Sequence, residues 1–242
     1  MKITLLYDNR SIGPTSSLTP GSGFSAFIEF EGKNIIFDTG ADSMILSKNM
    51  EMIGINKNQV DMIFLSHDHC DHVGGLSPIL RSNPNVNVYI LESFSQDIKD
   101  KVSAFKGNLT CIKEPVEIEN NIQSTGEMEG VLQVIRKIAE QSLIFKTEKG
   151  LVLIVGCAHP GILEIVEKAE ELTGTHGIHL ALGGFHLLEE SDAEIDSIAH
   201  SLRSHVEIAA PCHCSGDQAL KSFERIYKEN YLACGVGRRI II

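Results

Sequence analysis

The sequence has no tryptophan, no excess of basic residues and no long apolar run. Its 21 lysines and arginines face 32 aspartates and glutamates, for a net charge of -11, so the basic surface of a nucleic-acid-binding protein is not expected. No apolar run approaches the ~20 residues of a transmembrane helix, so no membrane partner is expected. Residues 1–6 are typical of a strand rather than a signal peptide, and we expect a cytoplasmic protein.

The six cysteines lack the C-x-x-C spacing of structural zinc sites and redox motifs. Without a secretion signal, we expect them to be reduced thiols. The 242 residues are 43% hydrophobic, which is enough for one sizeable core. We therefore predict a single domain over residues 1–242.

A dense cluster of metal-ligand side chains follows an apolar run at 60–65. Residues 66–75 read Ser-His-Asp-His-Cys-Asp-His-Val-Gly-Gly. Imidazole and carboxylate suit zinc, iron or manganese. His67 and His69 point to the same side of an extended backbone, while Asp71 and His72 follow where the chain turns and can face a second ion. An adventitious surface cluster is the alternative, which the preceding buried strand disfavours.

Three later strands are each predicted to end in a loop with a histidine. These strands cover 151–155, 178–182 and 208–210, and their loops carry His159, His186 and His213. Because an α/β scaffold collects ligands at its strand ends, we expect them at one rim.

The intervening elements are predicted from periodicity and capping. We expect helices over 41–54, 76–81, 93–105 and 162–172, with Gly54 ending the first. Capping boxes are predicted for Ser191 with Glu194 and for Ser215 with Gln218. Residues 107–135 indicate only short strands and a hairpin, with 126–130 as turn material.

The motif H-x-H-x-D-H-x-G-G, the earlier F-D-T-G at 37–40 and the late histidine resemble the metallo-β-lactamase superfamily over essentially the whole chain. The resemblance implies an α/β fold, a four-layer αββα sandwich. It also implies that Asp38 supports the metal loop, with helix capping as the alternative. The phrases G-C-A-H-P-G, G-G-F-H-L and P-C-H-C-S-G resemble a subgroup of dihydropterin-ribofuranosyl-aminobenzene-phosphate synthase-like proteins.

The middle of the chain departs from the family pattern. The usual P-G-H-T-like histidine is missing, and Gly156-Cys157 stands where a bridging aspartate usually follows a strand. His159 is the replacement ligand, and Cys157 is either a thiolate ligand or a buried thiol under the site. His186 binds substrate or donates a proton, unless it is a core histidine. Cys70 is interpreted as facing away from His69. Cys212 and Cys214, on either side of His213, are interpreted as packing residues.

The resulting hypothesis is a dinuclear hydrolase. His67, His69 and His159 hold one divalent transition-metal ion. Asp71, His72 and His213 hold the other. Zinc is expected, with manganese or iron as alternatives. The pair lowers the pKa of a bridging water, and the metal-bound hydroxide attacks a small phosphoester or a nucleotide- or pterin-like phosphate. Asp71 orients the nucleophile, and His186 protonates the leaving group.

Helix starts after Gly161 and Gly216 suit a phosphate. The alternative function is a metal-dependent synthase or binding protein for a phosphorylated pterin-like molecule, without hydrolysis. A di-iron redox enzyme is disfavoured because the chain has no room for a flavin domain. An RNA-processing enzyme is disfavoured because a basic surface is missing, and a secreted lactamase because no signal segment is expected. The oligomeric state is not predicted.

Overall fold

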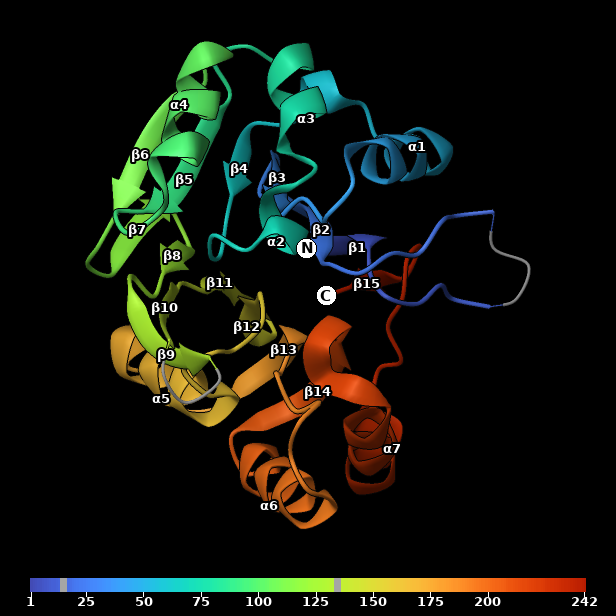
Figure 1. Ribbon diagram of the computed structural model, residues 1–242. Coiled ribbons are helices and arrows are strands. Elements are labelled where there is room, and N and C mark those ends of the chain that lie inside the picture. Colours follow the sequence, from blue (N-terminus) through green and yellow to red (C-terminus); the bar gives the residue numbers. More distant parts are fainter. Residues whose placement is uncertain (14–16, 133–135) are drawn as a thin grey trace. The chain divides into compact units, whose positions relative to one another are not determined.

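The computed structural model describes residues 1–13, 17–132 and 136–242. The chain forms two compact units. Unit 1 comprises residues 1–113 and 234–242, and unit 2 comprises residues 114–233. Each unit is a mixed α/β structure with its own sheet and helices (Figure 1). The α/β class predicted from the sequence is therefore confirmed, while the single domain stays a prediction.

Unit 1 is built on a seven-stranded sheet of order β15-β1-β2-β3-β4-β5-β6. Its strands are β1 (Lys2–Tyr7), β2 (Ser25–Phe30), β3 (Lys33–Phe37), β4 (Met62–Phe64), β5 (Asn87–Leu91), β6 (Asn108–Ile112) and β15 (Arg239–Ile241). Its helices are α1 (Ser43–Ile53), α2 (Cys70–Val73), α3 (Leu76–Ser82), α4 (Gln96–Ala104) and the 3₁₀ turn η1 (Lys57–Gln59). Strands β3 to β6 are parallel, and Phe37 pairs with Phe64, so the chain leaves β3 and β4 at the same edge.

Unit 2 has a six-stranded sheet of order β14-β13-β12-β11-β8-β7 and a separate hairpin, β9–β10. Its strands are β7 (Val116–Glu119), β8 (Ile122–Ser124), β9 (Met128–Leu132), β10 (Arg136–Glu140), β11 (Leu143–Thr147), β12 (Gly150–Val155), β13 (Ile178–Gly184) and β14 (Val206–Cys212). Its helices are α5 (Ile162–Thr173), α6 (Asp192–Arg203), α7 (Gly216–Tyr227) and the 3₁₀ turns η2 (His213–Ser215) and η3 (Lys228–Asn230). Because β12, β13 and β14 are parallel neighbours, the loops that follow them emerge side by side.

Helices α5, α6 and α7 close the core of unit 2 (Figure 1). Their apolar faces bury Val166, Leu202 and Phe223 against strand residues such as Leu153. The Phe185 ring, directly after β13, lies 5.5 Å from the Phe223 ring. This packing anchors the end of β13, where the candidate histidines begin.

Several predicted elements are confirmed and two details are wrong. Gly54 ends α1 with φ 85°, and Ser191 with Glu194 forms the predicted capping box. The box predicted for Ser215 is absent, because its hydroxyl donates to the Cys212 carbonyl (2.7 Å) and accepts from the Phe185 N–H (3.0 Å). Gly130, expected in a turn, lies inside strand β9. Part of that predicted hairpin, 133–135, lies outside the described residues.

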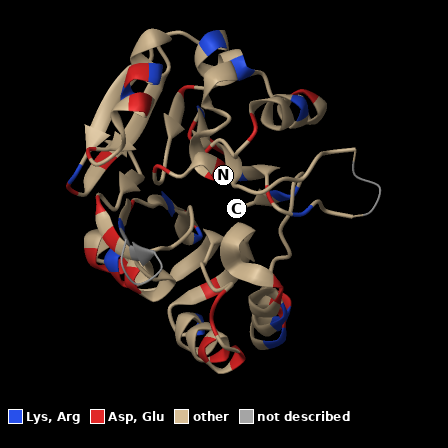
Figure 2. Ribbon diagram, in the orientation of Figure 1, with Lys and Arg blue, Asp and Glu red and all other residues tan. Residues whose placement is uncertain are grey.

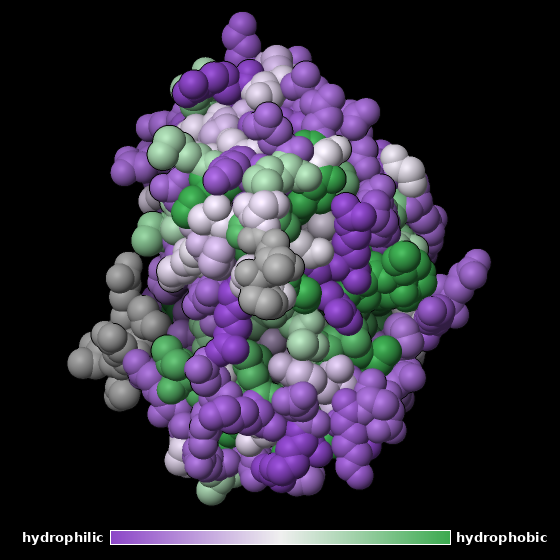
Figure 3. Space-filling model, turned by 90° about the vertical axis from the view of Figure 1, so that its right-hand side faces the viewer, coloured by the Kyte–Doolittle hydropathy of each residue, from purple (hydrophilic) through white to green (hydrophobic). Residues whose placement is uncertain are grey.

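Charged residues of both signs are interspersed along the helices (Figure 2). On the face in Figure 3, hydrophilic residues predominate and hydrophobic ones form small separate groups. The most exposed large hydrophobic side chains of the described residues, Met44, Leu188 and Ile241, are far apart in sequence. Within the described ranges, every helix is too short or too polar to cross a bilayer.

Candidate metal centre

The histidine motif of unit 1 brings two ring nitrogens close together. Nε2 of His67 lies 3.1 Å from Nδ1 of His69. Two nitrogens that each lie about 2.1 Å from one tetrahedral zinc are about 3.4 Å apart. The observed spacing therefore fits two imidazoles that bind the same ion, as the sequence predicted for this pair.

Asp71 and His72 form a second pair on the short helix α2. Oδ2 of Asp71 lies 3.9 Å from Nε2 of His72. One ion can bridge an oxygen and a nitrogen that are up to about 4.3 Å apart. The His72 side chain is fully buried, whereas that of Asp71 is partly exposed. This pair has the geometry and the donor types for a second ion.

Asp38 fixes the orientation of the motif from beneath. Its buried carboxylate accepts hydrogen bonds from the Ser66 N–H and hydroxyl, both at 2.7 Å, and lies 2.6 Å from Nδ1 of His72. Burial raises the pKa of Asp38, although His72 and Ser66 oppose the rise. A carboxylate on Nδ1 leaves Nε2 of a histidine as the ligand atom. The capping alternative is wrong, because Asp42 caps α1.

In unit 2, the loops after β12, β13 and β14 contain residues in a strained backbone conformation. Ala158, His186 and His213 have φ values of 62°, 50° and 49°. A non-glycine residue in this region costs on the order of 1–3 kcal/mol, and such residues gather at functional sites. Asp38 of unit 1 has the same property, with φ 52°. Four of the nine non-glycine residues with positive φ among the described residues are thus predicted site residues or, for Ala158, a neighbour of one.

Glu140 is a functional candidate that sequence reasoning missed. Its buried carboxylate accepts from the backbone N–H groups of Cys157 (2.8 Å), Ala158 (3.0 Å) and His159 (2.9 Å). It also lies 2.7 Å from Nδ1 of His159. Burial raises the pKa of Glu140, but these hydrogen bonds outweigh it and lower the pKa to about 2. Glu140 thus gives His159 the same support that Asp38 gives His72.

Gly130 explains how the β9–β10 hairpin packs on this loop. A Cβ atom at Gly130 would overlap the backbone of His159. A glycine inside a strand often marks such a close approach of another backbone. The sequence signals this contact only through the glycine itself, which the sequence predicts in a turn.

The thiols of unit 2 are closer to the candidate ligands than predicted. The ligand atoms of Cys157, His213 and Cys214 lie within 4.8 Å of one another. The ligand atoms of Cys157, His159 and His186 also lie within 4.8 Å of one another. The packing interpretation of Cys214 is therefore wrong. Burial raises the pKa of the Cys214 thiol, but Cys157, His186 and His213 outweigh it and hold the pKa well below its usual value.

The other two thiols next to ligand histidines differ in burial. Cys212 is buried, as its packing interpretation requires, whereas Cys70 is exposed. All six cysteines are described, and none forms a disulfide.

His186 lies against His159, with ring centroids 4.6 Å apart. A hydrogen bond with Cys214, opposed by burial, raises the pKa of His186 above its usual value. Its buried Nδ1 has no hydrogen-bond partner among the described residues. A buried ring nitrogen without a partner, among thiols and imidazoles, fits a site that an ion or a substrate completes.

A cavity of about 310 Å³ opens beside these histidines in unit 2. Its wall includes His159, His186, Phe185, Leu187, Glu164 and Glu190. Small-molecule pockets have volumes of about 300–1,000 Å³ and mostly apolar walls with a few polar groups. The cavity thus has the size and lining of a small-ligand pocket.

The start of α5 at this cavity is not free for the predicted phosphate. The Glu164 carboxylate folds back over Gly161, the N-cap of α5, where an added Cβ would overlap it. A carboxylate already placed at a helix N-terminus repels a second anion.

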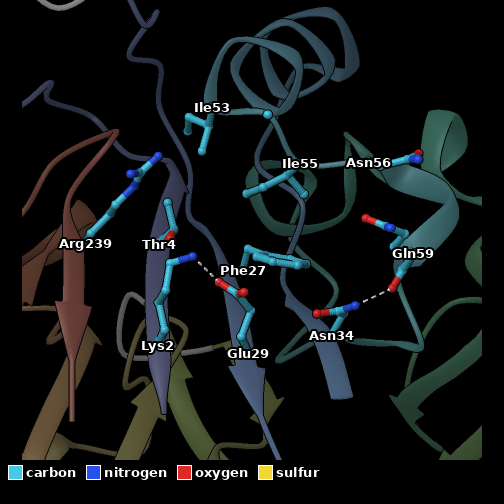
Figure 4. A pocket seen from close by; sticks show the side chains of 11 residues that line it. Lys2, Thr4, Phe27, Glu29, Asn34, Ile53, Ile55, Asn56, Gln59 and Arg239 are labelled. Carbon is cyan, nitrogen blue, oxygen red and sulfur yellow. Dashed lines mark hydrogen bonds and ion pairs between the residues drawn. The ribbon is translucent and has the colours of Figure 1, made fainter. Parts of the chain in front are cut away.

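A second cavity, of about 160 Å³, lies in unit 1 and contains none of the predicted site residues (Figure 4). Lys2 pairs with Glu29 at 2.5 Å, and Asn34 donates to the Gln59 carbonyl at 2.8 Å (Figure 4). Lys2 and Glu29 are paired with each other and the Asn34 amide is bound to the Gln59 backbone, so we place no function there.

Comparison with known proteins agrees with this geometry. The family model of the metallo-beta-lactamase superfamily matches residues 18–137. An uncharacterized protein of Methanocaldococcus jannaschii, MJ0448, is 31% identical over 90% of this chain and 92% of its own. The chain belongs to the metallo-beta-lactamase superfamily, and the predicted family and fold are confirmed.

Two further relatives narrow the comparison. The 7,8-dihydropterin-6-methyl-4-(beta-D-ribofuranosyl)-aminobenzene-5'-phosphate synthase of the same organism is 27% identical over 90% of this chain and 89% of its own. A crystal structure of a metal-dependent hydrolase of the beta-lactamase superfamily, Tm1679, superposes with a TM-score of 0.79 at 26% identity, over 100% of this chain and 99% of its own. The named relatives thus include both a synthase and a hydrolase.

Proposed function

We propose that the protein is a metal-dependent hydrolase with a dinuclear site that acts on a small phosphoester or a nucleotide- or pterin-like phosphate. The proposed ligands are His67, His69 and His159 for one ion, and Asp71, His72 and His213 for the other. The observation that carries the proposal is the pairing of donor atoms in unit 1, with Nε2 of His67 at 3.1 Å from Nδ1 of His69. Zinc suits this donor set best, with manganese or iron as alternatives.

A divalent ion at this site would supply a Lewis acid that activates water near neutral pH and stabilises negative charge on a phosphoryl oxygen. Asp38 and Glu140 hold the Nδ1 atoms of His72 and His159, so that the Nε2 atoms serve as ligands. Asp71 has a carboxylate oxygen that can orient the attacking water. His186 borders the cavity of unit 2 and would protonate the leaving group.

The charge of the cavity indicates which part of a substrate it takes. Glu164 and Glu190 contribute carboxylates to its wall, while Phe185, Leu187 and Ile198 contribute apolar surface. A phosphate would be repelled there, whereas a neutral ring with hydrogen-bond donors would be accepted. We therefore assign the organic leaving group to the cavity and the phosphoryl group to the ion ligands. We propose a reducing, cytoplasmic location, with which six cysteines that form no disulfide are consistent.

The second candidate function is a metal-dependent synthase or binding protein for a phosphorylated, pterin-like molecule. One relative that spans the chain is named a synthase of a 5'-phosphate. Cys157 also stands where the superfamily commonly has a bridging aspartate, so this site need not perform the common hydrolysis.

Turnover of bis-p-nitrophenyl phosphate separates the two functions. The hydrolase proposal predicts release of p-nitrophenol that stops after chelation and returns with added zinc. His179→Ala, which changes a histidine paired with Glu207 outside the candidate site, should keep full turnover. Metal-loaded protein that binds a phosphorylated pterin but shows no turnover of any phosphoester would favour the synthase or binding function.

A further inference from the structure

Two cysteines of unit 2 belong to the same donor group as a candidate histidine. The ligand atoms of Cys157, His213 and Cys214 lie within 4.8 Å of one another. Around one tetrahedral zinc, two sulfurs are about 3.8 Å apart and a sulfur and a nitrogen about 3.6 Å apart. The group can therefore close on one ion by side-chain movements alone.

The position of Cys214 is determined by its neighbours. A Cβ at Gly184 would lie 2.5 Å from the Cys214 sulfur, so the absence of a side chain at Gly184 makes room for the thiol. The same sulfur lies 3.5 Å from the carbonyl oxygen of Cys157. The Cys214 thiol is thus held beside the loop of Cys157, and supporting contacts of this kind are typical of metal sites.

The turn that carries His213 and Cys214 is fixed as well. Strand β14 ends at Cys212, and the 3₁₀ turn η2 begins at His213 with φ 49°. The buried Ser215 hydroxyl connects this turn to the Cys212 carbonyl and to the Phe185 N–H. The strained turn thus directs the Cys214 thiol toward the loop after β12.

We propose that Cys157, His213 and Cys214 form a thiolate-rich metal site in unit 2, which makes the chain prefer thiophilic ions such as Zn(II) and Co(II) to Mg(II) and Mn(II). The inference rests on the proposed function through His213 and deepens it by adding sulfur ligands to that ion. Thiolates select zinc and related ions, whereas carboxylates and water suit magnesium and manganese. Each thiol that binds releases its proton to solvent, and no group changes its oxidation state.

Cobalt titration of the full chain, with its thiols kept reduced, tests this site. Bound Co(II) should show a thiolate-to-cobalt charge-transfer band in the near ultraviolet. The band should disappear in a Cys157→Ser and Cys214→Ser double variant and weaken in each single variant. Zinc affinity of Cys214→Ser, measured by chelator competition, should fall about tenfold or more, with manganese affinity unchanged. Cys111→Ser, which changes an exposed thiol of β6, is the matched control and should behave as the wild type.

Two results would overturn the inference in distinguishable ways. Wild-type protein that binds Co(II) without the charge-transfer band, while His69→Ala weakens binding, would reject the thiolate site and leave the proposed function intact. Wild-type protein that binds no divalent ion would reject both. The charge-transfer band of the wild-type protein tests thiolate binding even where a cysteine variant fails to fold.

Discussion

In unit 1 the candidate ligands come from one loop of nearly consecutive residues, 67–72, whereas in unit 2 they come from three loops that follow separate parallel strands. Unit 1 offers imidazole and carboxylate, held by the buried Asp38. Unit 2 offers imidazole and thiol, held by the buried Glu140. The same support, a buried carboxylate on a histidine Nδ1, therefore serves two different ways of assembling candidate ligands.

Backbone strain differs between the two regions. Positive φ occurs under the ligands of unit 1, at Asp38, but within or next to the ligand positions of unit 2, at Ala158, His186 and His213. The contiguous motif needs one strained support, whereas separate loops must each be turned toward a common point. We expect unit 2 to be the more sensitive region to small changes in packing.

The largest effect is expected for His159→Ala. This substitution removes the one ligand of the first ion that we propose for unit 2. Turnover should therefore be abolished, and the affinity for that ion should be greatly reduced. Folding should survive, because the apolar faces of β12 and α5 are unchanged. Turnover and metal titration measure the effect, with His179→Ala as the matched surface control. Activity equal to the wild type would remove His159 from the site.

The next largest effects are expected for the two buried carboxylates, and their substitutions should weaken metal binding to a similar extent. Asp38→Asn and Glu140→Gln should each lower metal affinity by about 10–100-fold, because the supported histidine loses its oriented tautomer. Glu140→Gln should also destabilise the fold by about 3 kcal/mol, since three backbone N–H groups lose a charged acceptor. Denaturant unfolding and metal competition test both. A strong effect at one carboxylate and none at the other would end the analogy between the units.

Gly130→Ala should produce a smaller change. The added methyl would overlap the His159 backbone and shift the loop, at a cost of about 1–3 kcal/mol, with weaker metal binding. Glu129→Ala on the same hairpin is the control, because its exposed pair with Lys137 contributes little. If both variants bind metal like the wild type, the hairpin does not position His159.

The smallest effect concerns Glu170, outside the candidate site. Burial raises its pKa, but the Gly177 N–H and His205 outweigh this, so the pKa lies below its usual 4.5. A lowered carboxyl pKa stabilises the fold above the unfolded pKa, and the stabilisation is lost as pH falls through the folded pKa. Glu170→Gln should therefore cost about 1 kcal/mol near neutral pH and progressively less below pH 4.5. Unfolding curves at several pH values check this, and a pH-independent difference would contradict it.

The sequence predicted the ligands of unit 1 because they are contiguous and follow an apolar strand. It predicted His159 and His213 from strand ends, since parallel strands deliver their loops to one edge. Glu140 escaped detection because it acts on residues 17–19 positions away, across a segment with weak periodicity. The prediction for Cys214 is wrong because the alternation of an extended strand stops at Cys212, where the chain turns into η2.

Elemental analysis of protein purified without added metal most directly tests the proposal that each unit supplies ligands to bound ions. We predict up to two transition-metal ions per chain, fewer in His69→Ala, and loss of the second ion alone in His213→Ala. An unchanged metal content in His69→Ala, or the loss of both ions or neither in His213→Ala, would contradict it.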